Sequence, residues 1–281
     1  MKKKHLLFRI ILYILLLGLL LPVALTCLYS LCSVEEMNAF LTTQGRYSGK
    51  LMEIKLIPRQ VSLGQYWNVM IKDEAYLRFY LNSLAYTAVI LLGQIMIVPM
   101  TAYGLSRFRF RGKELLSFLV IMLLLLPFQV TMVPSVLMLR SIELINTPWA
   151  MILPSLASPL YIFLLRQSMV SIPGELFEAA QIDGAGPIRC FFSVALPACR
   201  AMLGAFVALS FADLWNMVEQ PLAFLPEKEQ LHPLSVMFHE MAESDAGSSF
   251  AGAFLYLLPA LMMYLFFQQD IAAGLQLSEL K

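Results

Sequence analysis

Apolar residues fall into six long runs, separated by shorter polar segments. The runs occupy roughly residues 6–32, 78–105, 115–139, 148–169, 201–225 and 250–268. A helix of about 20 apolar residues crosses the hydrocarbon core of a bilayer, which is about 30 Å thick. The pattern therefore predicts an all-α, polytopic membrane protein with six transmembrane helices. Prolines within or at the ends of these runs predict kinks, which neighbouring helices must tolerate by satisfying the freed carbonyl groups.

The polar segment between the fourth and fifth runs, residues 171–200, predicts two short helices around a glycine turn. Pro173 suits the first turn of a helix, where its missing N–H costs nothing. Glu175 adds negative charge at the positive end of the helix dipole. Asp183 and Gly184 should end this first helix, because glycine adopts the left-handed conformation without a Cβ penalty.

Each helix of this hairpin has an apolar face. In the first helix the face consists of Leu176, Ala179 and Ala180. Pro187 can open the second helix, which Leu196 and Pro197 are expected to end. Its apolar face consists of Ile188, Phe191, Phe192 and Ala195. The two helices would form a compact knob that another protein could bind.

Those residues resemble the EAA loop of permeases from binding-protein-dependent ABC importers, particularly the carbohydrate-uptake branch. The matching motifs are EAA at 178–180, DGA at 183–185 and LP at 196–197. The resemblance covers roughly residues 77–275, and its spacing is more specific than a lone glycine motif. Ala201 departs from it, because the branch often has a second proline there, and this puts a kink at that position in doubt. The further matching motifs are Asn82-Ser83-Leu84, Arg107 to Gly112, Leu164 to Gln167, Ser171-Ile172-Pro173, Trp215-Asn216 and Pro221-Leu222.

The resemblance implies the fold of a type I ABC importer permease with three regions. Residues 1–76 would form the first transmembrane helix and an external loop. Residues 77–275 would form the permease core with its cytoplasmic coupling loop at 171–200, and residues 276–281 a cytoplasmic tail.

The resemblance also implies partners and a coupling site. The partners are a second permease subunit, a pair of ATP-binding subunits that hold ATP and magnesium, and an extracellular solute-binding protein. The loop would dock on the ATP-binding subunit through Glu178, Ala179, Ala180, Asp183, Gly184, Ala185, Leu196 and Pro197. Alanines allow close approach, and Glu178 can pair with a basic residue of the partner.

Composition agrees with a membrane protein and excludes several other classes. The chain has 281 residues, 59% of them hydrophobic and 14% charged, with a mean hydropathy of +0.72. Its net charge of +1 is scattered and builds no surface for nucleic acid. The four cysteines show neither a CxxC pair nor zinc spacing, so free or packed thiols are expected in place of a disulfide framework.

The sequence contains no catalytic or cofactor motif that would make this chain an enzyme. The nearest fragment to a phosphate loop, Gly112-Lys113-Glu114, lacks the preceding glycine and the hydroxyl that binds magnesium. We therefore expect ATP hydrolysis on a separate chain and neither a cofactor nor a metal on this one. His239-Glu240 begins like a zinc helix, yet Glu243 stands where the second histidine belongs. The alternatives to a permease subunit of an ABC importer are a secondary transporter or channel, and an intramembrane enzyme.

Polar residues in or near the fifth run are candidates for a solute pathway or a gate, because hydrocarbon makes polar groups costly. These candidates are Asp213, Trp215, Asn216 and Glu219. The alternative explanations are packing against another helix, or reaching water from a helix end.

The distribution of lysine and arginine predicts that both termini lie in the cytoplasm, and the resemblance implies a multi-pass protein of the bacterial plasma (inner) membrane. Residues 33–77 carry mixed charges and are expected outside, as a solvated cap or a contact for an external partner. The cationic segments that define the cytoplasmic side contain Lys2, Lys3, Lys4, Arg9, Arg107, Arg109, Arg111, Lys113, Arg166, Arg189 and Arg200.

Reporter fusions test this topology. A fusion after Arg109 or after Gly184 should report the cytoplasm, and one after Gly49 should report the outside. A cytoplasmic signal after Gly49 would contradict the six-span arrangement.

Overall fold

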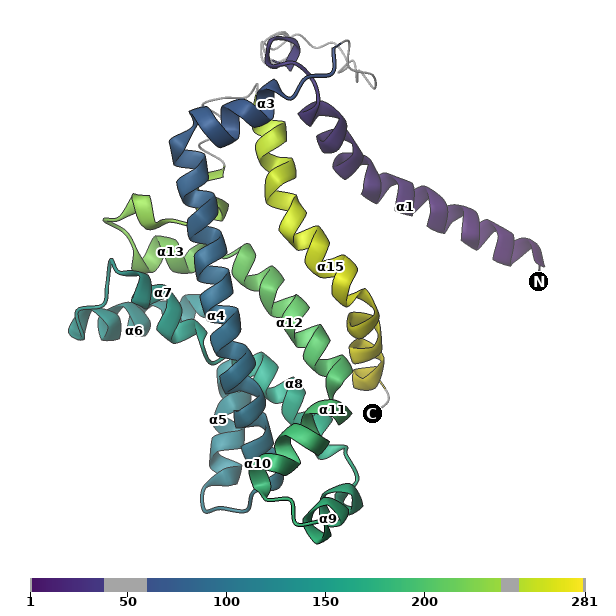
Figure 1. Ribbon diagram of the computed structural model, residues 1–281, viewed down its shortest axis with the longest axis vertical. Helices are drawn as coiled ribbons and strands as arrows, with labels where there is room; N and C mark the ends of the chain where they lie inside the picture. The colour runs from purple at the N-terminus through teal and green to yellow at the C-terminus, as the bar shows by residue number, and fades with distance from the viewer. Residues whose placement is uncertain (1, 38–59, 239–247, 280–281) are drawn as a thin grey trace. The chain divides into compact units, whose positions relative to one another are not determined.

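The computed structural model describes residues 2–37, 60–238 and 248–279 (Figure 1). These residues form helices, turns and an isolated β-bridge between Cys32 and Val61, which confirms the all-α prediction. The long helices are α1 (Lys2–Ser30), α4 (Glu74–Arg107), α5 (Lys113–Leu125), α6 (Phe128–Ser141), α8 (Pro159–Val170), α12 (Arg200–Trp215) and α15 (Ser249–Glu279). The shorter elements are α3 (Gly64–Trp67), α7 (Pro148–Ser155), α9 (Gly174–Ile182), α10 (Pro187–Cys190), α11 (Leu196–Ala198), α13 (Glu219–Phe224), the π-helical turns η1 (Asn68–Lys72) and η2 (Phe191–Ala195), and the 3-10 turn η3 (Glu229–Leu231).

Four stretches of the described chain are long and apolar enough to cross a membrane unbroken. Two further helix pairs reach that length only across a bend: α5 with α6 at 110°, and Pro187–Ala198 with α12 at 79°. By length and composition there are thus four candidate spans, or up to six if each bent pair is one span. The four unbroken stretches are Arg9–Ser30, Glu74–Arg107, Pro148–Val170 and Ser249–Gly274.

Pro127 explains the break in the third predicted run, which the sequence analysis treated as one helix. Leu126 has an extended backbone with ψ of 122°, because the ring of a following proline disfavours the α conformation. By contrast, Pro99 and Pro259 lie inside α4 and α15 without ending those helices.

The fifth predicted run also differs from the structure. The helix α12 ends at Trp215, and α13 begins four residues later at Glu219. The side chain of Asn216 donates a hydrogen bond of 2.9 Å to the carbonyl of Ala212, and so satisfies a carbonyl at the end of α12. The predicted fifth run therefore does not continue past Trp215 as one helix. Instead, α12 forms a bent pair with the preceding helix, which ends at Ala198.

The chain forms two compact units. One contains the described parts of residues 1–80 and 237–259, and the other contains the described parts of 81–236 and 260–281. The sequence analysis placed the first boundary after residue 76 and assigned 237–259 to the core. In the structure the described part of 237–259 groups with the N-terminal unit. Much of the predicted external loop, residues 38–59, lies outside the described residues.

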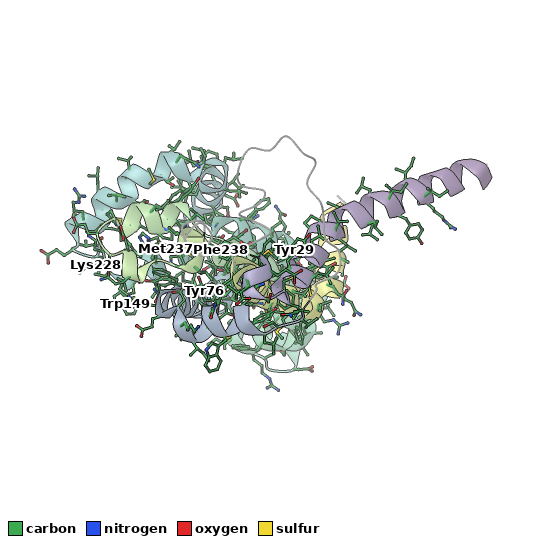
Figure 2. The ribbon with its side chains drawn as sticks, turned by 90° about the horizontal axis from the view of Figure 1, so that it is seen from above. Tyr29, Tyr76, Trp149, Lys228, Met237 and Phe238 are labelled. Carbon is green, nitrogen blue, oxygen red and sulfur yellow. The ribbon has the colours of Figure 1, made fainter. Side chains whose placement is uncertain are left out.

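In the first unit, α1 exposes apolar side chains around its whole circumference, as Figure 2 shows. Residues 9–24 are exposed, which suits a helix surrounded by lipid. Only the end of α1 is packed: Gln65 donates hydrogen bonds to the carbonyls of Tyr29 (2.7 Å) and Cys32 (3.0 Å). The ring of Tyr29 also meets Phe250 edge to face.

All four cysteines carry free thiols, as the sequence analysis expected. Burial, with a smaller contribution from the nearby charge of Glu36, raises the pKa of the Cys32 thiol. This thiol therefore stays protonated and unreactive at neutral pH.

The second unit is a helical bundle with a hairpin at one end. Helices α5 and α12 pack on α8, and α13 packs on α6 and α7. Figure 1 shows α9 and α10 at one end of this unit, and α6, α7 and α13 toward the other. The core between α4, α8, α12 and the hairpin includes Val98, Ala102, Leu165, Met169 and Phe206.

Small residues let α12 and α15 approach each other closely within the second unit. A Cβ atom added at Gly204 would lie 2.5–2.6 Å from the side chain of Asp270, and one at Gly274 would lie 2.8 Å from the Cβ of Ala205. Because lipid provides no hydrophobic drive between helices, close packing of this kind carries their association.

Gly204→Val should therefore loosen the contact between α12 and α15 and lower the midpoint of thermal unfolding of the detergent-purified protein. The expected loss is about 1–3 kcal/mol, typical of overpacking. Gly104→Ala is the matched control, because no atom lies within 4 Å of the added Cβ. Equal midpoints for the Gly204 variant and the wild type would refute this role of Gly204.

Candidate functional site

The hairpin predicted at residues 171–200 consists of α9 followed by a second helix. Gly184 has a φ of +79°, in the left-handed region that glycine adopts freely. The N–H of Ala185 bonds the carbonyl of Ala180 (2.9 Å), and that of Gly184 bonds Gln181 (3.0 Å). These bonds satisfy carbonyls at the end of α9, so the glycine turn has the predicted form.

The second helix ends at Ala198, one residue beyond the Leu196-Pro197 pair that was expected to end it. It continues through η2 and α11 to Ala198 and bends by 79° into α12 at Cys199. Pro197 is tolerated within this helix because the preceding turn, η2, is π-helical. The regular pattern of α-helical hydrogen bonds is therefore already interrupted where the N–H of Pro197 is missing. A kink near Ala201 is thus present without a second proline.

The hairpin packs on the bundle through only part of the predicted apolar faces, together with Phe177, which was not predicted. In α9 the buried side chain is Phe177, whereas Leu176 and Ala179 are exposed. In the second helix Phe191 and Ala195 are buried, whereas Ile188 and Phe192 are exposed. A short helix turns its largest ring inward because that buries the most apolar area, and in α9 this leaves Leu176 and Ala179 outside.

Most of the predicted coupling residues lie on the outer surface of the hairpin. Glu178, Ala179, Asp183, Gly184 and Pro197 are exposed, and Ala180, Ala185 and Leu196 are partly buried. Two residues that the sequence analysis did not assign to coupling are also strongly exposed: Ile182 at 86% and Ile188 at 75%. The sequence could have indicated these two isoleucines as contact residues, because apolar side chains beside a polar turn are costly to leave in water.

The end of α4 holds the hairpin in place. The Nη2 atom of Arg107 donates hydrogen bonds to the carbonyls of Met169 (2.6 Å) and Ile172 (2.7 Å). Its guanidinium carbon lies 4.0 Å from the centroid of the Phe177 ring. One turn earlier, the hydroxyl of Tyr103 donates a 3.3 Å hydrogen bond to the carbonyl of Pro187.

The candidate pathway residues lie in different surroundings. Asp213 is exposed and accepts a 2.5 Å hydrogen bond from the hydroxyl of Tyr161. Asn216 is exposed and caps α12. Trp215 is buried, with 1% of its surface exposed, and stacks on Phe211 with ring centroids 5.6 Å apart. Its ring therefore packs inside this chain.

Glu219 lines a cavity of about 600 Å³ between α6 and α13. Its carboxylate accepts a 2.7 Å hydrogen bond from the side-chain amide of Gln129. The rest of the lining is apolar and includes Met132, Val136 and Leu222. A cavity with apolar walls and one polar pair can accept a small solute that has both hydroxyl groups and a hydrocarbon face.

A buried amide joins the helices that break near these residues. Gln94 of α4 donates to the carbonyl of Ser155, at the end of α7, and accepts from the hydroxyl of Ser210 in α12. The hydroxyl of Ser155 in turn donates to the side chain of Gln220 in α13 (3.3 Å). Four helices are thus linked by polar groups that have no alternative partner in lipid.

The sequence and fold match known transport proteins. The family described as "Binding-protein-dependent transport system inner membrane component" matches residues 90–269. The arabinooligosaccharide permease protein AraQ of Halalkalibacterium halodurans is 27% identical over 80% of this chain and 81% of its own. The diacetylchitobiose uptake permease protein NgcG of Streptomyces coelicolor is 29% identical, over 89% and 85%.

The permease protein UgpE of Pectobacterium atrosepticum, from a sn-glycerol-3-phosphate transport system, is 30% identical over 71% of this chain and 72% of its own. Among solved structures, a bacterial ABC transporter involved in the import of the polysaccharide alginate superposes with a TM-score of 0.76. It is 22% identical and covers 95% of this chain and 96% of its own, so this likeness shows the fold.

Replacement of Trp215 tests whether its buried ring stabilises the fold. Trp215→Ala leaves a large cavity and should destabilise the purified protein by about 3–5 kcal/mol. Asp213→Asn keeps an acceptor for the hydroxyl of Tyr161 and removes little buried area, so it should lower the unfolding midpoint much less. Thermal unfolding of both variants is the measurement, and a wild-type midpoint for Trp215→Ala would refute the packing role.

Proposed function

This chain belongs to the family of binding-protein-dependent transport system inner membrane components, and we propose that it passes a sugar or sugar-like solute across the plasma membrane as a permease subunit of an ATP-driven importer. The match over residues 90–269 carries this proposal. The names of AraQ and NgcG, which transport an arabinooligosaccharide and diacetylchitobiose, favour a carbohydrate.

The hairpin is the element through which ATP hydrolysis on partner subunits would act on this chain. It presents a carboxylate at Glu178, small residues at Ala179 and Gly184, and apolar side chains at Ile182 and Ile188. Such a surface suits a groove in another protein: the isoleucines give apolar contact, and Glu178 gives a charge-assisted hydrogen bond. ATP and magnesium would be held by that partner.

Further partners follow from the same proposal. The large exposed apolar faces of α5 and α6 suit lipid or a second permease subunit, which would complete the pathway. An alginate transporter of the same fold, with a TM-score of 0.63, is described in complex with a periplasmic protein that carries a pentasaccharide. A solute-binding protein is the corresponding partner on the outside.

The solute pathway would include Asp213, Asn216 and Glu219, together with the cavity beside Gln129. Carboxylate and amide groups can exchange hydrogen bonds with sugar hydroxyls, and the apolar walls can meet the hydrocarbon face of a sugar ring. Trp215 would not contact the solute; its buried ring would fix the end of α12 and so position Asp213 and Asn216. Closure of the ATP-binding pair would move the hairpin, and movement of the bundle would then alternate access to the pathway.

Two substitutions in the hairpin test the coupling role. Glu178→Lys should place a repulsive charge at the interface and weaken docking by roughly tenfold to a hundredfold, as expected for a charge-assisted contact of about 1.5–3 kcal/mol. Gly184→Val should misplace the second helix, because a β-branched residue is strained at a φ of +79°. Both should reduce co-purification of the ATP-binding subunit together with uptake of labelled arabinotriose and diacetylchitobiose.

Gly186→Val is the matched control for the turn. Gly186 lies two residues further on with a φ of −71°, and no atom lies within 4 Å of an added Cβ. This variant should retain docking and uptake. Normal co-purification and uptake in both the Glu178 and the Gly184 variants would contradict the coupling role of the hairpin.

A further inference from the structure

Arg107 lies where three elements of the second unit meet. It is the last residue of α4, and its two hydrogen bonds end on carbonyls at and just beyond the end of α8. The carbonyls of the last turn of a helix lack partners within the helix, and the dipole makes that end negative. The guanidinium of Arg107, which belongs to a neighbouring helix, therefore caps the C-terminal end of α8.

The same guanidinium lies over the ring of Phe177 in α9, at 4.0 Å. Phe177 is buried, with 6% of its surface exposed, so the contact is shielded from water and correspondingly stronger. Within the described residues, the Nε atom of Arg107 is buried and has no hydrogen-bond partner. Leaving a buried donor unsatisfied is costly, so the Nη2 bonds and the ring contact outweigh this cost and fix the position of the group.

Tyr103 extends the contact to the other helix of the hairpin. It precedes Arg107 by four residues and so lies on the same face of α4. Its hydroxyl bonds the carbonyl of Pro187, which opens α10, and its ring lies 5.2 Å from that of Phe191. The end of α4 thus contacts both helices of the hairpin, and the hairpin cannot shift against α4 without breaking these contacts.

Chain continuity alone would not move α4 with the hairpin. The hairpin is joined directly to α8 and α12, whereas α4 is separated from it in sequence by α5, α6, α7 and α8. Thirteen residues before Arg107, about 20 Å along the helix, Gln94 of α4 bonds Ser155 and Ser210 beside the helix breaks of the bundle. A rigid α4 would therefore carry a displacement from the hairpin to those breaks.

We propose that Arg107 is a positioning residue that makes α4 move with the hairpin during the ATP cycle, so that α4 transmits the movement to the polar residues of the bundle. This inference rests on the proposed function, in which ATP-binding subunits act on the hairpin. It assigns to Arg107 a role beyond the positive charge that a cytoplasmic segment normally carries.

The test compares two single cysteines in the purified importer with its ATP-binding subunits, after replacement of the four native cysteines by alanine. Glu175→Cys reports the hairpin and Leu81→Cys reports the far end of α4; both positions are exposed. The measured quantity is the rate of labelling by N-ethylmaleimide in the resting state and after trapping with MgATP and vanadate. With Arg107 present, trapping should change both rates by about fivefold or more, the lower range of typical coupling between sites.

Arg107→Met removes the charge and the donors but keeps an apolar side chain of similar length. In this variant trapping should still change labelling at Glu175→Cys, while the change at Leu81→Cys should be lost. Arg107→Lys, which keeps the charge and one donor group, should restore part of the change. Arg109→Met, at an exposed position two residues further on, is the control and should behave as the parent protein.

A full change at Leu81→Cys in Arg107→Met would overturn the proposal. If Arg107→Met does not accumulate, Phe177→Leu provides the test, because it keeps apolar volume and removes the ring face; a full change at Leu81→Cys in that variant would overturn the proposal equally. Absence of any change at Glu175→Cys in the parent protein would instead show that the hairpin does not move, which is a failure of the proposed function.

Discussion

The second unit depends on one constraint: backbone groups that are freed where a helix breaks must find partners inside the protein, because lipid offers none. Residues 81–107 of α4 provide many of these partners. Asn82 donates to the carbonyls of Gln230 and His232, and the hydroxyl of Ser83 accepts from the N–H of Leu234. Gln94 donates to a carbonyl at the end of α7, and Arg107 donates to a carbonyl at the end of α8. The broken neighbours are thus held by one continuous helix.

This arrangement gives a physical reason for the combination of broken and unbroken helices. The bends at Pro127 and Cys199 and the gap between α12 and α13 place polar groups such as Asp213 and Glu219 beside irregular backbone, where a solute pathway can form. Such segments would be loose without fixed partners. A continuous α4 supplies those partners and also reaches the hairpin, so the element that stabilises the breaks can move them together.

The sequence predicted those features that depend on local pattern. Hydropathy located the long helices, and Gly184 located the turn of the hairpin with the correct left-handed backbone. The sequence did not predict features that depend on contacts between distant residues. Arg107 donates to carbonyls 62 and 65 residues further along the chain. The sequence analysis placed it in a cytoplasmic cationic motif of the family but did not predict these contacts.

Burial is likewise not a local property. Trp215 was a candidate for the pathway together with Asp213, since both belong to one polar stretch, but the ring turns inward onto Phe211 while the carboxylate stays exposed. In α9, Phe177 turns inward and Ala179 outward, because the largest ring gains most from burial. The π-helical turn before Pro197, which lets the second helix continue, has no sequence signal that we recognise.

The central claim is that the outer surface of the hairpin binds the ATP-binding subunit, and photo-cross-linking from that surface tests it most directly. A benzophenone amino acid at Ile182, where 86% of the side chain is exposed, should yield a covalent product with the ATP-binding chain in intact membranes. The same probe at Ile14 of α1, also exposed, should yield none. A purified importer that retains its ATP-binding subunits but gives no such product from Ile182 would contradict the account.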